Sequence, residues 1–86
     1  TEVQVSLPGQ PTLRAPSPSL SKIAFDGRRL LGFDATSTVY VFEIQGDRLV
    51  KVFERLVPGV RSVALDANSD RGMIGLEDGA ALLVAK

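Results

Sequence analysis

The sequence predicts an all-β fold, because short segments rich in β-branched and aromatic residues alternate with turn signals along most of its 86 residues. The chain also repeats part of its own sequence, with an offset of 40 residues at the first match and 43 at the next two. The matching pairs are Ile23-Ala24-Phe25-Asp26 with Val63-Ala64-Leu65-Asp66, Gly32-Phe33-Asp34 with Gly75-Leu76-Glu77, and Val39-Tyr40-Val41 with Leu82-Leu83-Val84. A repeat of about 40–45 residues built from strands is typical of the blades of a β-propeller.

The N-terminal segment predicts one strand followed by a connector. Apolar residues occupy every second position of Glu2–Leu7, which is the pattern of a half-buried strand, and Pro8-Gly9 ends it. Residues 1–9 therefore supply a strand without a unit of its own. Residues 10–20 are rich in Pro and Ser and predict an extended connector.

Residues 21–57 predict a first blade of four strands. The expected strands are Lys22–Asp26, Arg29–Asp34, Thr38–Ile44 and Arg48–Leu56. The Val-Tyr-Val-Phe run of the third strand indicates burial on both faces. A helix over 48–57 is the alternative for the fourth, because Leu49, Val52, Phe53 and Leu56 have helical spacing. The Gly46-Asp47 turn signal favours the strand.

Residues 58–86 predict a second blade with three strands, Val60–Asp66, Gly72–Glu77 and Ala80–Lys86. Because a propeller blade has four strands, we expect the N-terminal strand to close this one. The assembly residues would then be Val3, Val5 and Leu7, paired beside Leu82, Leu83 and Val84.

Both predicted blades resemble WD repeats. In the first, Ile23-Ala24-Phe25 precedes an Asp26-Gly27 turn and Thr38–Phe42 forms a later strand; in the second, Glu77-Asp78-Gly79 carries an acidic residue before a Gly turn. The Gly-His and Trp-Asp signatures of that family are absent, since the chain has neither His nor Trp. The resemblance implies a β-propeller fold without the polar network that those signatures form.

Two blades cannot close a ring, so the prediction extends to assembly. Several copies could form a ring of about six to eight blades. The chain could instead complete a propeller begun by another polypeptide, or be a piece of a longer one. We favour the homo-oligomer because the terminal strands are suited to closure. The alternative fold is a small closed barrel or sandwich of about seven strands.

Composition excludes several classes of function. Ten basic and ten acidic residues cancel, which gives no long-range attraction for nucleic acid or for an anionic membrane. No apolar run is long enough for a membrane-spanning helix, and neither a start methionine nor a signal-peptide pattern occurs. Without Cys and His, disulfides, thiolate metal sites and His-based catalysis are excluded.

The remaining chemical candidates have structural interpretations. Carboxylates at strand ends, namely Asp26, Asp34, Asp66 and Glu77, are expected to cap turns. The oxygen-bearing residues of 66–70 have calcium-like spacing but lack the central Gly and the distal Glu of such loops. We expect Tyr40 to pack in the core with its hydroxyl satisfied, and Gly32 and Gly75 to allow close strand packing.

These observations predict a non-enzymatic interaction or scaffold module with no cofactor and no metal, whose partners are other protein chains. The expected binding surface is the turn-bearing face, with Asp26, Arg28, Asn68, Asp70 and Arg71 as candidates. The alternative is a propeller that binds a carbohydrate or another small molecule between blades.

Overall fold

The computed structural model describes residues 1–66, 71–79 and 81–85, and these residues form an all-β structure of antiparallel strands. No helix occurs among them. The strands are β1 (Glu2–Val5), β2 (Leu13–Pro16), β3 (Leu20–Phe25), β4 (Arg29–Asp34), β5 (Thr38–Gln45), β6 (Arg48–Leu56), β7 (Val60–Leu65), β8 (Arg71–Leu76) and β9 (Ala81–Ala85).

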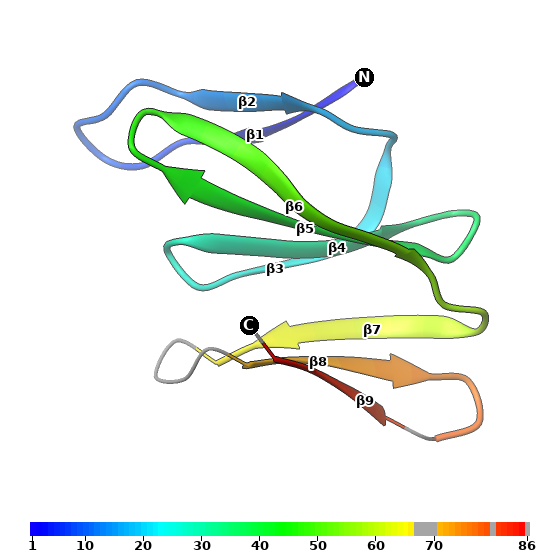
Figure 1. The fold of residues 1–86 in the computed structure, drawn as a ribbon. Helices are drawn as coiled ribbons and strands as arrows, with labels where there is room; N and C mark the ends of the chain where they lie inside the picture. Colours follow the sequence, from blue (N-terminus) through cyan, green and yellow to red (C-terminus); the bar gives the residue numbers. More distant parts are fainter. Residues whose placement is uncertain (67–70, 80, 86) are drawn as a thin grey trace.

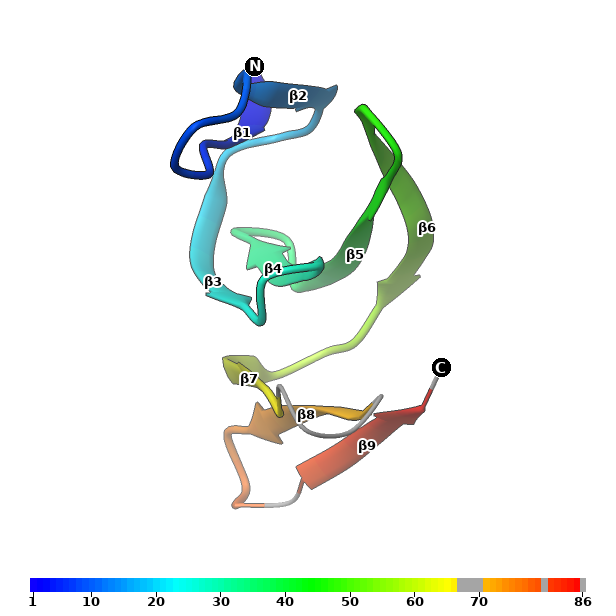
Figure 2. The ribbon, with the colours of Figure 1, turned by 90° about the vertical axis from the view of Figure 1, so that its left-hand side faces the viewer.

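The strands form three sheets that lie in layers (Figure 1). The four-stranded sheet, in the order β3-β4-β5-β6, lies between a β1-β2 hairpin and a three-stranded sheet in the order β7-β8-β9. Figure 2 shows the same three layers from the side. None of the sheets closes on itself among the described strands. The layers are consistent with the alternative of a sandwich.

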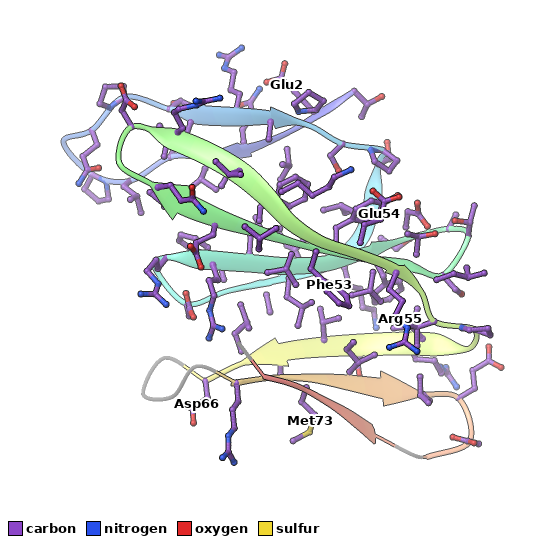
Figure 3. All side chains as sticks on the ribbon, viewed as in Figure 1. Glu2, Phe53, Glu54, Arg55, Asp66 and Met73 are labelled. Carbon is purple, nitrogen blue, oxygen red and sulfur yellow. The ribbon has the colours of Figure 1, made fainter. Side chains whose placement is uncertain are left out.

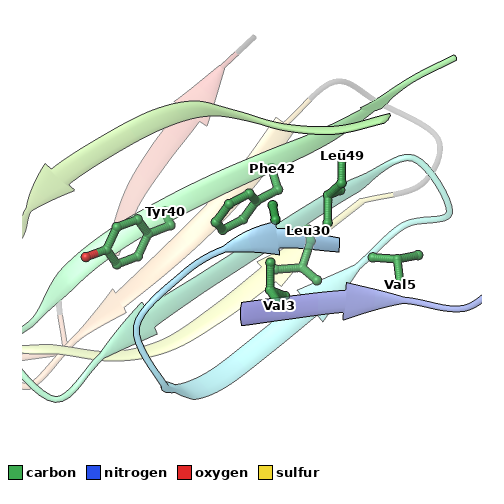
Figure 4. Close-up of a cluster of buried hydrophobic side chains, with 7 residues drawn as sticks. Val3, Val5, Leu30, Tyr40, Phe42 and Leu49 are labelled. Carbon is green, nitrogen blue, oxygen red and sulfur yellow. The ribbon is translucent and has the colours of Figure 1, made fainter. Parts of the chain in front are cut away.

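The middle sheet supplies the core because it is covered on both faces. Val39, Tyr40, Val41 and Phe42 on β5 are all buried, as the apolar run predicted. One cluster lies toward the hairpin and joins side chains from β1, β2, β4, β5 and β6 (Figure 4). Its buried members are Val3, Val5, Ala15, Leu30, Tyr40, Phe42 and Leu49. A second cluster lies toward the three-stranded sheet, and its buried members are Leu31, Phe33, Val39, Val41, Val57, Val60 and Ile74.

The first hairpins of the two larger sheets share a register. Leu20 pairs with Asp34 and Val60 pairs with Leu76, and each strand pair contains a bulge directly after that first pair. The position that corresponds to a residue of β3 therefore lies 40 residues later on β7. On β4 and β8 the offset given by these pairs is 42 residues, from Asp34 to Leu76.

The turns that follow β4 and β8 also share their geometry. The Ser37 amide donates a hydrogen bond to the Asp34 carbonyl, and the Gly79 amide donates one to the Leu76 carbonyl. The donor–acceptor distance is 3.1 Å in each. Ser37 and Gly79 have left-handed φ angles of 66° and 86°. The Gly32–Gly75 match predicted an offset of 43 residues between the two units, whereas the strand pairing gives 42. Gly75 therefore lies one residue beyond the position that corresponds to Gly32.

The N-terminal part of the fold corrects two predictions. The expected connector over 10–20 contains β2, which pairs with β1 and buries Ala15 against the middle sheet. The expected strand Glu2–Leu7 ends at Val5 and pairs with β2. Residues 82–84 belong to β9, on the far side of the middle sheet (Figure 1). Within one chain, β1 therefore does not close the three-stranded sheet; its pairing with β9 of another copy stays a prediction.

The segment 48–57 resolves the helix alternative in favour of the strand. Arg48–Leu56 forms β6 and pairs with β5 from Gln45 to Thr38. A bulge between the Val41 and Phe42 pairs interrupts this ladder. The apolar residues with helical spacing therefore lie on a bulged strand and not on a helix.

Candidate functional site

Asp26, a candidate for the turn face, holds the turn between β3 and β4. Its Oδ1 accepts hydrogen bonds from the backbone N–H groups of Arg28 (2.9 Å) and Arg29 (2.7 Å), and its Oδ2 lies 3.2 Å from Nε of Arg29. Burial raises the pKa of Asp26, but the Arg29 and Arg28 amides and the Arg29 guanidinium outweigh it, and the net pKa is lowered. The expected capping role of Asp26 is confirmed.

Asp34 holds the next turn, between β4 and β5. Its Oδ1 accepts from the hydroxyl of Thr36 (2.7 Å) and from the amides of Thr36 (2.9 Å) and Thr38 (3.1 Å), while its Oδ2 accepts from the hydroxyl of Tyr40 (3.1 Å). The Thr36 hydroxyl is the largest cause of the lowered pKa of Asp34. Burial and the Asp34 carboxylate raise the pKa of Tyr40. A carboxylate engaged by four donors is a structural group rather than an available acid or base.

Tyr40 lies in the core, as expected, because its side chain is only 7% exposed and its hydroxyl is engaged by Asp34. The ring stacks with Phe42 at a centroid distance of 6.3 Å, and Nζ of Lys51 lies 5.9 Å from its centre. A ring held in this way does not present a free face on which a sugar could stack.

The other turn-face candidates are not gathered into a site by the described residues. Asn68 and Asp70 lie outside them. Arg71 is exposed at the start of β8, and its carbonyl accepts a 3.2 Å hydrogen bond from the Asp66 amide, as the Arg29 carbonyl does from the Asp26 amide. Glu77 is exposed, and its amide donates to the Gly59 carbonyl over 2.8 Å.

A hollow of about 240 Å³ is lined by Thr1, Glu2, Arg14, Ala15 and Pro16, so the hairpin region forms it and it does not lie between sheets. In the described ranges 1–66, 71–79 and 81–85, no group of three or more acidic side chains could hold a metal ion.

One exposed apolar surface lies on β3, which we call the β3 patch and define as Ile23 and Phe25. Ile23 is 57% exposed and Phe25 is 40% exposed. Ile23 pairs with Gly32 and Phe25 with Leu30, so both side chains lie on the face of the middle sheet that carries the hairpin. The hairpin contacts that sheet at its other edge, through β2 and β6, and leaves the patch open.

A second exposed apolar side chain, Met73, lies on β8 and is 50% exposed. It points away from the middle sheet (Figure 3), whereas its neighbour Ile74 is 2% exposed and packs against that sheet. Met73 pairs with Ala64, which is also exposed. We call this outer surface, Met73 with Ala64, the β8 face.

Neither surface was predicted from the sequence, although the repeat relates their residues to buried ones. Val63 and Leu65 on β7 lie 40 residues after Ile23 and Phe25, and they pack against the second core cluster. Leu31 on β4 lies 42 residues before Met73 and is fully buried. The repeat marks Ile23, Phe25 and Met73 as positions whose counterparts are apolar, and the structure shows that these three are the exposed members of each pair.

Comparisons with known protein families, with characterised proteins and with solved structures give no match. No helix that could cross a membrane is present in the part of the chain that the structure describes. Besides the β3 patch and the β8 face, Val52 and Leu56 on β6 are also exposed apolar residues, at 47% and 61%.

Proposed function

We propose that this chain is a non-enzymatic protein-interaction module built from β-propeller-type blades, and that other protein chains complete it. The four-stranded sheet would be one blade and the three-stranded sheet most of the next. The matching bulges, the matching turns after β4 and β8, and the WD-like sequence pattern support this interpretation.

One observation carries the proposal. Apolar side chains that are covered at one place in the fold are exposed at the corresponding place 40 or 42 residues away: Val63 and Leu65 are packed, whereas Ile23 and Phe25 are open. Adjacent blades cover each other's faces, so a module with uncovered faces is suited to binding another sheet.

Asp26 and Asp34 hold turns, and the Arg29 side chain is paired with Asp26. The ten basic and ten acidic residues balance, so net charge does not favour binding to a charged partner.

Site-specific photocrosslinking tests the proposal. Benzoylphenylalanine is introduced in place of Phe25 or Met73, with Val52 as the control, because Val52 is 47% exposed but lies on β6. Each variant is irradiated in the cells that express the protein. We expect adducts with another protein chain at positions 25 and 73 and few at 52. Equal yields at all three positions would contradict the proposal.

A further inference from the structure

We infer that the partner of the β3 patch is a second copy of this chain, which brings its β8 face onto Ile23 and Phe25. The contact is head-to-tail: one copy contributes β3 and the next contributes β8. This inference rests on the proposed function and names its partner.

The interface inside the chain is the template for this contact. There, β7 places Val63 and Leu65 against the second core cluster, to which Leu31 and Phe33 of the middle sheet belong. A Cβ atom added to Gly72 would lie 3.1 Å from Cδ2 of Leu31, so the absence of a side chain at Gly72 leaves room for Leu31 against β8. The side chains of this packed interface come from β7 and β8 on one sheet, from β4, β5 and β6 on the other, and from Val57 between them.

The second copy would repeat part of each side of that template, because Gly32 stands at the position of Ile74 and Gly75 at the position of Phe33. Ile23 and Phe25 occupy the positions of Val63 and Leu65, and Met73 occupies the position of Leu31. A copy that docks its β8 face on the β3 patch therefore repeats a sheet-on-sheet contact that this sequence already makes once. The apolar character of both surfaces is thereby accounted for.

The β3 patch continues an interface that already exists. Leu20, on the same strand, packs against the first core cluster beneath the hairpin. A Cβ atom at Gly32 would lie 2.9 Å from Cδ1 of Leu20 and 3.1 Å from Cγ2 of Ile23, so the two side chains meet over this glycine. A sheet placed on the patch would extend the layer that the hairpin begins on this face of the middle sheet.

The two surfaces differ in residues and lie on different sheets, so the contact is heterologous rather than two-fold symmetric. A heterologous contact generates rings when its rotation closes and filaments when it does not. This property permits a test in which each surface is blocked separately.

Complementation of blocked variants provides the test. Ile23→Asp blocks the β3 patch, Met73→Asp blocks the β8 face, and Val52→Asp is the matched control at an exposed valine. Masses are measured by light scattering on the purified proteins. We expect the wild type and Val52→Asp to assemble and each blocked variant alone to have the mass of one chain, 9.2 kDa. An equimolar mixture of the blocked variants should form a dimer, because one intact surface remains on each partner.

Several results would overturn the inference: a monomeric wild type, blocked variants that still assemble, or a mixture that stays monomeric. Far-UV circular dichroism verifies that the strands are retained. If an Asp variant unfolds, Ile23→Ser or Met73→Ser replaces it in the same mixture, with the same expected dimer. If the wild type is monomeric while positions 25 and 73 crosslink to a different protein, the inference fails and the proposed function stands.

Discussion

The hydroxyl of Tyr40 donates a 3.1 Å hydrogen bond to Oδ2 of Asp34, and it thereby ties the core to the turn between β4 and β5. Asp34 in turn accepts from Thr36 and Thr38 through Oδ1. The Tyr40 ring belongs to the first core cluster. Packing beneath the hairpin and the shape of this turn are therefore coupled through one carboxylate.

A double-mutant cycle measures this coupling. Tyr40→Phe removes the hydroxyl that donates to Asp34, and Asp34→Asn removes the negative charge of the acceptor. We expect each change to lower the free energy of unfolding by about 1–3 kcal/mol. The double variant should lose less than the sum, by about 1 kcal/mol, because both changes remove the same hydrogen bond. Urea denaturation gives these values, with Asp47→Asn as the control at an exposed turn carboxylate. Fully additive effects would show that the two groups act independently.

Stability should fall in acid. The pKa values of Asp34 and Asp26 are lowered from 3.8 in the folded protein. Their contribution is complete above that value and is lost as the pH falls through the lower folded pKa values. We expect the free energy of unfolding to decrease from about pH 5 downward, and the decrease to be smaller in a variant that carries Asp26→Asn and Asp34→Asn. Urea denaturation between pH 7 and pH 2 tests this. Equal acid sensitivity in the two proteins would mean that other groups dominate.

Ser37 is the one described residue other than glycine with a left-handed φ, 66°, and the corresponding turn after β8 has Gly79. Ser37→Gly should raise the free energy of unfolding by about 0.5–1 kcal/mol, because glycine adopts this conformation without strain. The backbone hydrogen bond from Val57 to Ser37 is retained. Ser37→Ala is the control and should give no such gain. A loss of stability in Ser37→Gly would contradict this account of the turn.

Gly32 allows β3 to lie close against β4. Its added Cβ would lie 2.9 Å from Cδ1 of Leu20 and 3.1 Å from the Lys22 carbonyl oxygen, which cannot move away without the strand. Gly32→Ala should therefore destabilise the fold by about 1–3 kcal/mol in thermal or urea unfolding. The same change combined with Leu20→Val should cost less, since the nearest atom is then absent. A neutral Gly32→Ala would show that the strands have room to separate.

Local signals predicted the strands of the two larger sheets well. The buried run of β5 and the Asp26-Gly27 turn both depend on neighbours close in sequence. The sequence match paired Gly75 with Gly32, but in the sheets Gly75 lies one residue beyond the position that corresponds to Gly32. Matching residue types did not detect this one-residue slip, which moves a side chain to the other face of a strand.

The N-terminal hairpin was not predictable in the same way. Residues 10–20 have a connector's composition, and Ala15 is buried only because β2 lies over the middle sheet.

The two Pro-Gly turns show that the same local turn can lead to different pairings. Amide-to-carbonyl bonds from Gln10 to Leu7 (3.1 Å) and from Val60 to Val57 (3.3 Å) close the same kind of turn. After the first, the chain returns to pair with β1, and after the second it enters another sheet.

The exposed surfaces needed both the repeat and the structure. The sequence matched Ile23 and Phe25 with Val63 and Leu65, but it did not indicate which pair is covered. Coverage depends on where the hairpin lies: it covers Leu20 of β3 but leaves Ile23 and Phe25 exposed, and this is a property of the folded chain.

The mass of the wild-type chain in solution tests the central claim most directly. Light scattering across a range of micromolar concentrations should give a mass several times 9.2 kDa, the mass of one chain. That result follows if the β3 patch of one copy is covered by the β8 face of the next. A mass of one chain at every concentration, with an intact β-sheet circular dichroism spectrum, would contradict the claim.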